Sequence, residues 1–291
     1  MIKIEPMRMI SANGLPLPAL GQGGWNLGEA PDKAQDEIAT LRLGLDLGLS
    51  LIDTAEMYGD GRSEQLIGNA LRGRSRAEYL LVSKVYPHHA DQKNIFTSCD
   101  ASLKRLQTDY LDLYLLHWRG SVPLEETIDC METLVKTGKI RRWGVSNFDV
   151  SDMEELWAVP GGKNCAVDQV LYHLGSRGIE YDLIPWLRSH QVAGMAYCPL
   201  AQAGSLTRMN QDFLRDPTLL TVAAKYKISV MQLLLAFVLR QDNLVAIPKT
   251  SSPVHLRENK RVLGLSIVDS DWHKIDRIFW PPTAKMHLDI E

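Results

Sequence analysis

LIDTAEMYGDG, residues 51–61, is the stretch that decides the fold. It begins with apolar residues typical of a buried strand and ends in a Gly-Asp-Gly turn that predicts the start of a helix near Ser63. Between them, Asp53 ends the strand and Tyr58 lies on the loop just beyond it. In parallel β/α proteins, ligands bind outside the carboxyl ends of the strands. A carboxylate and a phenol at this place therefore indicate a site.

Outward from this stretch, short apolar runs alternate with amphipathic segments along the chain. The alternation predicts strands over 20–24, 51–54, 80–85, 111–116, 140–145, 166–171, 192–197 and 245–247, and helices over 31–47, 62–71, 92–106, 124–136, 151–158, 182–189, 219–226, 230–240 and 253–263, with an insert at 201–210. Eight strands alternating with helices in this length favour a (β/α)8 TIM barrel that spans residues 1–291 as a single domain.

Two further segments lie outside the alternation. Residues 7–20 predict a β-hairpin that caps one end of the barrel, because Asn13-Gly14 is a two-residue turn signal. The amphipathic segment 269–279 predicts an extra C-terminal helix. A doubly wound sheet is the alternative fold. It is disfavoured because the nearest dinucleotide fingerprint, GQGGWN at 21–26, has Asn26 where the third glycine belongs.

Composition is that of an ordinary soluble protein, with 45% hydrophobic and 23% charged residues. The net charge of -3 gives no electrostatic reason to expect a nucleic acid or an anionic membrane as partner. The four cysteines show no paired spacing, which favours reduced thiols in a cytoplasmic protein. Since no signal peptide, membrane-length apolar run or exposed apolar stripe is evident, we expect a cytoplasmic monomer.

Four ionisable residues lie at or just beyond the ends of successive strands: Asp53, Tyr58, Lys84 and His117. Taken singly, each has an ordinary structural explanation, such as a helix cap or a packed ring. Lys84 is different, because the strand around it is otherwise an interior one. A charge on such a strand needs a partner, and Asp53 is the obvious one.

Together the four residues suit the protonation of an oxyanion as it forms, which is the task of a carbonyl reductase. A phenol has a pKa near ~10 and is a weak acid at neutral pH. A nearby ammonium stabilises the phenolate, so Lys84 is expected to lower the pKa of Tyr58. Asp53 would hold that ammonium, and a neutral His117 would orient the carbonyl oxygen or share in the proton relay.

The motifs LIDTAEMYGDG, VSKV, LLHW, GVSNF, AYCPL and IPKTSSPVHLRENK, in this order, resemble those of the aldo-keto reductases, from Gly21 to about Leu263. DLYLLHW, GKIRRWGVSNF, VLYHLGSRGIEYDL and PLAQAG further resemble a bacterial subgroup that reduces methylglyoxal and related small aldehydes. The resemblance implies NADPH-dependent reduction of a small aldehyde or ketone to an alcohol, with Tyr58 as general acid.

The same resemblance implies which residues bind the cofactor and the substrate. Those at the nicotinamide are Gly23, Gly24, Trp25, Ser146, Asn147, Gln169 and Tyr197; Cys198, Pro199 and Leu200 follow on the same loop; Lys249, Thr250 and His255 belong to the 2'-phosphate, and Glu258 and Asn259 to the adenine. The substrate walls are expected to be Trp25, Tyr86 and Trp118. No metal ligand is implied.

Three residues depart from the family pattern. His255 stands where the family often has an arginine, Asp168 where many members have asparagine, and Cys198 where a serine is common. An imidazole and a thiol are weaker phosphate partners than a guanidinium and a hydroxyl, but Lys249 remains and NADPH is still the expected cofactor.

Two other functions remain open. Some proteins of this family type are regulatory subunits that hold the cofactor as a sensor with slow turnover, and a metal-dependent barrel hydrolase is a weaker alternative. The short segment after Trp280 predicts an open pocket and a small substrate.

Overall fold

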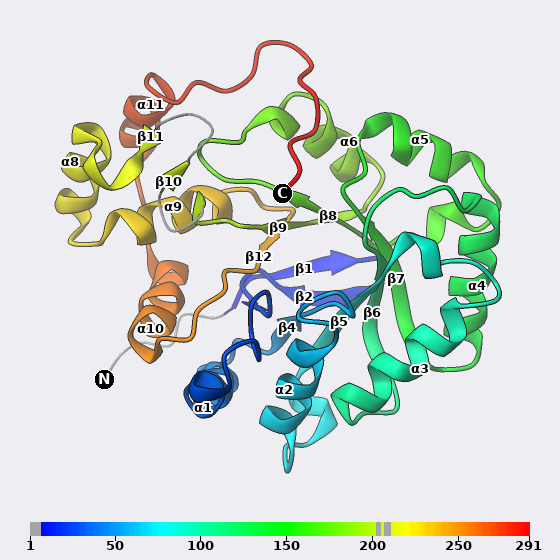
Figure 1. The fold of residues 1–291 in the computed structure, drawn as a ribbon. Helices are drawn as coiled ribbons and strands as arrows, with labels where there is room; N and C mark the ends of the chain where they lie inside the picture. The colour runs from blue at the N-terminus through cyan, green and yellow to red at the C-terminus, as the bar shows by residue number, and fades with distance from the viewer. Residues whose placement is uncertain (1–6, 202–204, 207–210) are drawn as a thin grey trace.

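A computed structural model describes residues 7–201, 205–206 and 211–291 of the protein (Figure 1). Its main sheet contains eight parallel strands that curl around a common centre, in the order β12-β9-β8-β7-β6-β5-β4-β3. They are β3 (Gln22–Gly23), β4 (Leu51–Asp53), β5 (Leu80–Val85), β6 (Leu111–Leu116), β7 (Ile140–Ser146), β8 (Val167–Leu171), β9 (Ala193–Tyr197) and β12 (Leu244–Ala246). Backbone hydrogen bonds from Ala246 to Ala19 and from Gly21 to Ala246 join the two edges of this sheet.

Helices lie around the outside of the curled sheet (Figure 1). They are α1 (Ala34–Asp46), α2 (Arg62–Leu71), α3 (Ile95–Leu106), α4 (Leu124–Lys136), α5 (Val150–Ala158), α6 (Leu183–Ser189), α8 (Pro217–Tyr226), α9 (Val230–Leu239), α10 (Pro253–Arg261) and α11 (Asp269–Asp276). Helix α4 shows how the helices pack against the sheet. Its apolar residues Leu124, Ile128, Met131 and Leu134 recur at helical spacing and form one buried face.

Two hydrophobic cores follow from the alternation of side chains along the strands. Val82, Leu113 and Leu115 belong to the inner core, and Leu116 and Val85 to the outer core that includes the helices. Ahead of the sheet, β1 (Met9–Ala12) and β2 (Leu15–Pro18) form an antiparallel hairpin whose apolar side chains join the inner core. Its turn residues Asn13 and Gly14 both have positive φ, as a two-residue hairpin turn requires.

Several element boundaries differ from those that the sequence predicts. Residues 31–33 form a 3-10 turn before α1, and α3 begins at Ile95 because Asp91 accepts a hydrogen bond from the backbone of Asn94 and forms a separate turn. Of the insert expected over 201–210, residues 202–204 and 207–210 lie outside the described part. Strand β10 (Ser205–Leu206) pairs with β11 (Gln211–Asp212).

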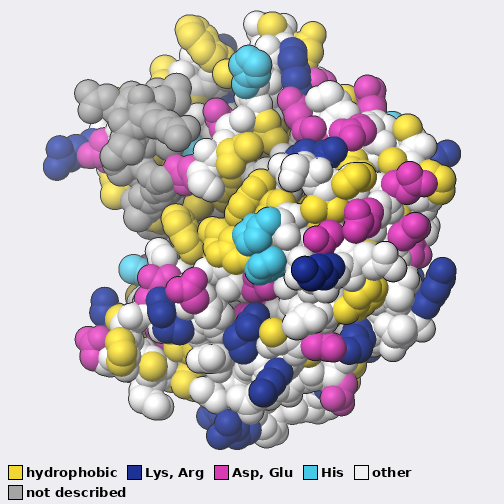
Figure 2. All heavy atoms as spheres, turned by 45° about the vertical axis from the view of Figure 1, so that its right-hand side comes forward, with side chains coloured by type: hydrophobic (Ala, Val, Ile, Leu, Met, Phe, Trp, Pro, Cys, Tyr) yellow, Lys and Arg dark blue, Asp and Glu magenta, His cyan; other side chains and the backbone are white. Residues whose placement is uncertain are grey.

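Side chains of both charges are interspersed over the face drawn in Figure 2, around a band of hydrophobic side chains. No single helix in the part that the structure describes is long and apolar enough to cross a membrane. Helices α8 and α9 would meet that length and hydropathy together, but they are bent by 85° relative to each other.

Candidate active site

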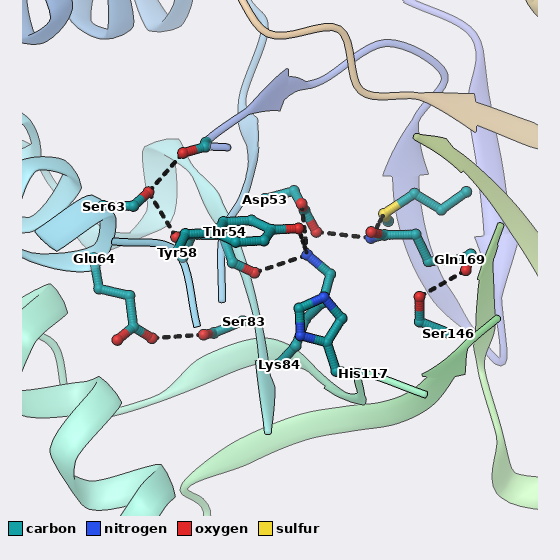
Figure 3. Close-up of polar contacts among 12 residues, drawn as sticks. Asp53, Thr54, Tyr58, Ser63, Glu64, Ser83, Lys84, His117, Ser146 and Gln169 are labelled. Carbon is teal, nitrogen blue, oxygen red and sulfur yellow. Dashed lines mark hydrogen bonds and ion pairs between the residues drawn. The ribbon is translucent and has the colours of Figure 1, made fainter. Parts of the chain in front are cut away.

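The carboxyl ends of neighbouring strands bring the predicted ionisable residues together (Figure 3). Asp53 is the last residue of β4, Lys84 lies near the end of β5, and His117 directly follows β6. These strands are adjacent in the sheet, so residues far apart in sequence meet at one end of it. Tyr58 reaches the same place from the loop between β4 and α2. This loop ends at Gly61, which caps the start of α2 with a left-handed backbone conformation.

Lys84 is the centre of this cluster and is fully buried. Its Nζ donates hydrogen bonds to Asp53 Oδ2 at 2.8 Å, to the Thr54 carbonyl at 2.9 Å and to the Tyr58 hydroxyl at 2.9 Å. The three protons of the ammonium are thus all used, and the predicted pairing of Lys84 with Asp53 is confirmed. Burial lowers the pKa of Lys84, but Asp53 and Tyr58 outweigh it and the net pKa is raised, so the lysine stays charged.

The expectation that Lys84 lowers the pKa of Tyr58 below its ordinary value is wrong. Burial of the phenol raises its pKa, and the charge of Lys84 offsets only part of that rise. For a phenolate in this site, the free energy lost by removing it from water would exceed the stabilisation that the ammonium provides. Tyr58 therefore keeps its proton at neutral pH and remains a donor until an acceptor with a developing negative charge is placed against it.

His117 is a neutral imidazole. Burial, together with the charge of Lys84, lowers its pKa to about 2. The ring meets that of Tyr58 edge to face, with centroids 5.7 Å apart, and its buried Nδ1 has no hydrogen-bond partner among the described residues. Tyr58 and His117 both line one cavity.

This lowered pKa makes the stability of the fold depend on pH. Below about pH 6.5 an unfolded histidine takes up a proton, whereas folded His117 stays neutral down to about 2. The unfolded state then binds more protons, so we expect the unfolding free energy to fall with decreasing pH by up to about 1.4 kcal/mol per pH unit. Urea titrations between about pH 6.5 and pH 4.5 measure this slope. His117→Asn should reduce this slope by the equivalent of about one proton, and the same change at exposed His273 should not. Equal slopes in the wild type and both variants would contradict the lowered pKa of His117.

A cavity of about 800 Å³ opens next to the cluster. Its lining contains Asp53, Tyr58, His117 and every residue that the family resemblance implies for the cofactor, namely Gly23, Gly24, Trp25, Ser146, Asn147, Gln169, Tyr197, Cys198, Pro199, Leu200, Lys249, Thr250, His255, Glu258 and Asn259. Lys84 lies behind Asp53 and Tyr58. Tyr86 and Trp118 are outside this lining; Trp118 packs against His117, with ring centroids 4.9 Å apart, and Tyr86 packs against Trp118.

Polar groups along one wall of the cavity hold one another in place. Asn147, whose φ is positive, accepts a hydrogen bond from the Tyr197 hydroxyl at 2.9 Å and donates to the His117 carbonyl at 3.3 Å. Gln169 Nε2 donates to the second oxygen of Asp53 at 2.8 Å, across the sheet from β8 to β4. The wall is therefore coupled through hydrogen bonds to both Asp53 and His117.

Asp168 lies beside this wall without reaching the cavity. It precedes Gln169 on β8, so its side chain points to the opposite face of the sheet, where it is fully buried. Burial raises its pKa well above the ordinary value, while the backbone N–H of Phe148 opposes the shift. Its Oδ1 accepts a hydrogen bond from the Phe148 backbone N–H, and its Oδ2 has no hydrogen-bond partner among the described residues. This departure from the family pattern therefore lies outside the cavity lining.

Sequence reasoning missed several lining residues: Asn26, Met57, Ser229, Met231, Gln232, Ile247, Pro248 and Glu291. Asn26 and Met57 adjoin predicted site residues, so proximity along the chain was a usable signal. The residues of α9 carry only the Ser229–Gln232 capping box, which marks a helix start rather than a site.

Known proteins resemble this chain in sequence and in fold over nearly its full length. Residues 19–279 match the sequence model of the Aldo/keto reductase family. The chain is 49% identical over 284 residues to the methylglyoxal reductase YeaE of Escherichia coli, covering 97% of this chain and 99% of that protein. It is 31% identical over 268 residues to a glyoxal reductase of Bacillus subtilis, covering 91% and 90%. An aldo/keto reductase of Klebsiella pneumoniae, crystallised with NADP and acetate, superposes with a TM-score of 0.94 at 48% identity, over 98% of this chain and 100% of that one.

Proposed function

The chain belongs to the aldo/keto reductase family, and from this premise we propose that it reduces small aldehydes and ketones of the methylglyoxal type with NADPH, using Tyr58 as general acid. The observation that carries the proposal is the single ammonium of Lys84, which bridges Asp53 and the Tyr58 hydroxyl beside a cavity. The relatives named for methylglyoxal and glyoxal support the substrate class.

The residues of the cavity fit a nicotinamide cofactor. Asn147, Ser146 and Gln169 offer amide and hydroxyl groups suited to a carboxamide, and Lys249 offers a positive charge suited to a phosphate. When bound, the cofactor supplies the hydride that reaches the carbonyl carbon. The structural relatives crystallised with NADP and NADPH support the choice of cofactor.

The chain's own residues orient the substrate and supply the proton. Tyr58 and His117 hydrogen-bond the carbonyl oxygen and orient it, His117 as a neutral donor. As negative charge develops on that oxygen, Tyr58 passes its proton to it, and the adjacent Lys84 stabilises the phenolate that remains. Asp53, fixed by both Lys84 and Gln169, keeps the ammonium in place.

We also infer that residues 1–291 form a single barrel domain, in which the hairpin β1–β2 caps the barrel and α11 is an additional helix. We infer a cytoplasmic monomer with no nucleic-acid or membrane partner. Trp25, which is 46% exposed and lines the cavity, forms the outer substrate wall. Tyr86 packs against Trp118, which packs against His117.

The test is the loss of NADPH absorbance with methylglyoxal and a short panel of aldehydes. Fast turnover of short aldehydes, and slow turnover of bulky steroids, is the expected result. Tight NADPH binding without turnover would favour the alternative, a regulatory or sensor subunit. The intact set of Asp53, Tyr58, Lys84 and His117 disfavours that alternative.

Cofactor choice gives a prediction at His255, which lies exposed in the first turn of α10 and lines the cavity with Lys249. A guanidinium is always charged and binds phosphate through two donors, so His255→Arg should lower the KM for NADPH by about five- to tenfold. The KM for NADH, which lacks the 2'-phosphate, should change little. Lys249→Met should act in the opposite direction on NADPH. Equal effects on both cofactors would remove these residues from the phosphate site.

A further inference from the structure

The turn that follows β5 carries aromatic rings that pack in a row toward the active site. Tyr86 precedes a 3-10 turn, Pro87–His89, and the centroid of its ring lies 5.9 Å from that of Trp118. Trp118 in turn packs against His117, with centroids 4.9 Å apart. Closely packed side chains transmit displacements to one another. The placement of this turn therefore affects the placement of the His117 imidazole.

Glu56 holds this turn from the loop between β4 and α2, the loop that also carries Tyr58. The Glu56 side chain is only 8% exposed. Its Oε1 accepts a hydrogen bond from the Tyr86 backbone N–H at 2.7 Å and lies 3.2 Å from His89 Nδ1. The backbone N–H of Glu56 donates to the Lys84 carbonyl at 3.3 Å. One residue thus joins the loop of the proposed general acid to both sides of the end of β5.

The same turn is fixed separately on the side of β6. Pro87 packs against Gly120 so closely that a side chain at that glycine would clash with the proline ring. The Thr127 hydroxyl donates to the Ala90 carbonyl at 3.1 Å, just beyond the turn. Loss of the Glu56 acceptor would therefore release the loop between β4 and α2 from a turn that stays packed on its other side.

Glu56 does not line the active-site cavity, although the next two residues, Met57 and Tyr58, do. Its carboxylate is therefore not placed to touch a cofactor or a substrate in that cavity. Any influence on the reaction passes through two groups that do line it, the Tyr58 hydroxyl on the same loop and the His117 imidazole at the end of the aromatic row.

From these contacts we propose that Glu56 is a positioning residue for the reduction, which holds Tyr58 and His117 at the spacing that a shared carbonyl oxygen requires. The inference rests on the proposed function and adds to it a residue that does not touch the substrate. The role requires the acceptor oxygen rather than the negative charge, because Tyr86 offers a neutral backbone N–H. A displacement of about 1 Å between reacting groups can lower a rate by about 10²-fold.

Two substitutions separate the hydrogen bond from the charge. Glu56→Gln keeps an acceptor oxygen at the same reach and loses the charge, whereas Glu56→Asp keeps the charge and shortens the side chain by one methylene. With methylglyoxal and NADPH, we expect Glu56→Gln to keep kcat within about twofold of the wild type and Glu56→Asp to lower it by about tenfold to a hundredfold. Glu154→Asp, the same change at an exposed position of α5, is the matched control and should keep the wild-type kcat.

Two further measurements distinguish positioning from a loss of folded protein. Quenching of protein fluorescence gives the Kd for NADPH and the number of binding sites, and both should match the wild type because Glu56 does not line the cavity. Since misplaced groups slow the chemical step, the kinetic isotope effect on kcat, with deuterium at the transferred position of NADPH, should be larger in Glu56→Asp than in the wild type.

Three results would overturn the inference. Wild-type kcat in Glu56→Asp would show that the carboxylate does not position the acid. A loss of rate in Glu56→Gln without one in Glu56→Asp would show that the charge matters and the hydrogen bond does not. A loss of rate that equals the loss of NADPH-binding sites would assign Glu56 to stability alone. A wild type that does not reduce methylglyoxal would refute the proposed function itself, and the role of Glu56 with it.

Discussion

Replacing Tyr58 by phenylalanine is expected to lower kcat for methylglyoxal about a thousandfold. The change removes one oxygen atom, and with it the proton that would reach the substrate. General acid catalysis contributes about 10²–10⁴ to such a rate. The ring remains, so its edge contact with His117 can persist. Stopped-flow or steady-state loss of NADPH absorbance measures the rate, and fluorescence titration measures NADPH binding, which should survive.

The exposed Tyr181, which lies outside the cavity lining, provides the control. Tyr181→Phe should keep the wild-type rate. Because the pKa of Tyr58 is raised above its ordinary value, its protonated form persists through neutral pH. The rate limb that depends on this proton should therefore fall off only at alkaline pH. A Tyr58→Phe enzyme with near wild-type kcat would show that another group donates the proton.

Lys84→Met is expected to cost about 3–5 kcal/mol of unfolding free energy, and most of the activity as well. Methionine fills a similar volume but leaves Asp53, which is 2% exposed, as a buried charge without its cation. Breaking a buried ion pair from one side has a cost of this order. The Tyr58 hydroxyl would also lose its hydrogen bond from the ammonium. Urea denaturation at neutral pH measures the loss.

A double-mutant cycle separates the pair from its surroundings. Asp53→Asn removes the stranded charge, so the double variant Asp53→Asn with Lys84→Met should be more stable than the sum of the single losses predicts. Strict additivity of the two single effects would mean that Lys84 and Asp53 are not coupled, against the 2.8 Å contact between them.

The cluster of Asp53, Tyr58, Lys84 and His117 was predictable because its members are marked locally. Asp53, Lys84 and His117 stand at the ends of apolar runs, and parallel strands bring such ends together. The partner of Lys84 followed from one rule, that a charge on an interior strand must be paired. The residues that the family resemblance assigned to the cofactor all lie in the cavity lining, and this assignment came from the resemblance alone.

Other features could not be derived from local sequence. The direction of the Tyr58 pKa shift is the difference between burial and the field of Lys84, and burial depth is a property of the whole fold. Tyr86 follows a strand end just as the site residues do, but its ring packs against Trp118 rather than lining the cavity. Glu291 lines the cavity because the residues after Trp280 make tertiary contacts, such as the hydrogen bond from Ser176 to Asp289, and no periodic sequence pattern predicts these contacts.

The closure of the sheet also bears on how the protein is made. The segment around Gly21 completes its hydrogen bonds with Ala246, which lies near the opposite end of the chain. During synthesis on a ribosome, that first strand leaves the exit tunnel long before Ala246 is made. It can pair with β4 early, but the backbone groups on its other edge stay unpaired for most of translation. Unpaired strand edges invite association between nascent chains. A ring that is joined by its first and last strands therefore keeps one edge open to such association until the last strand has been made.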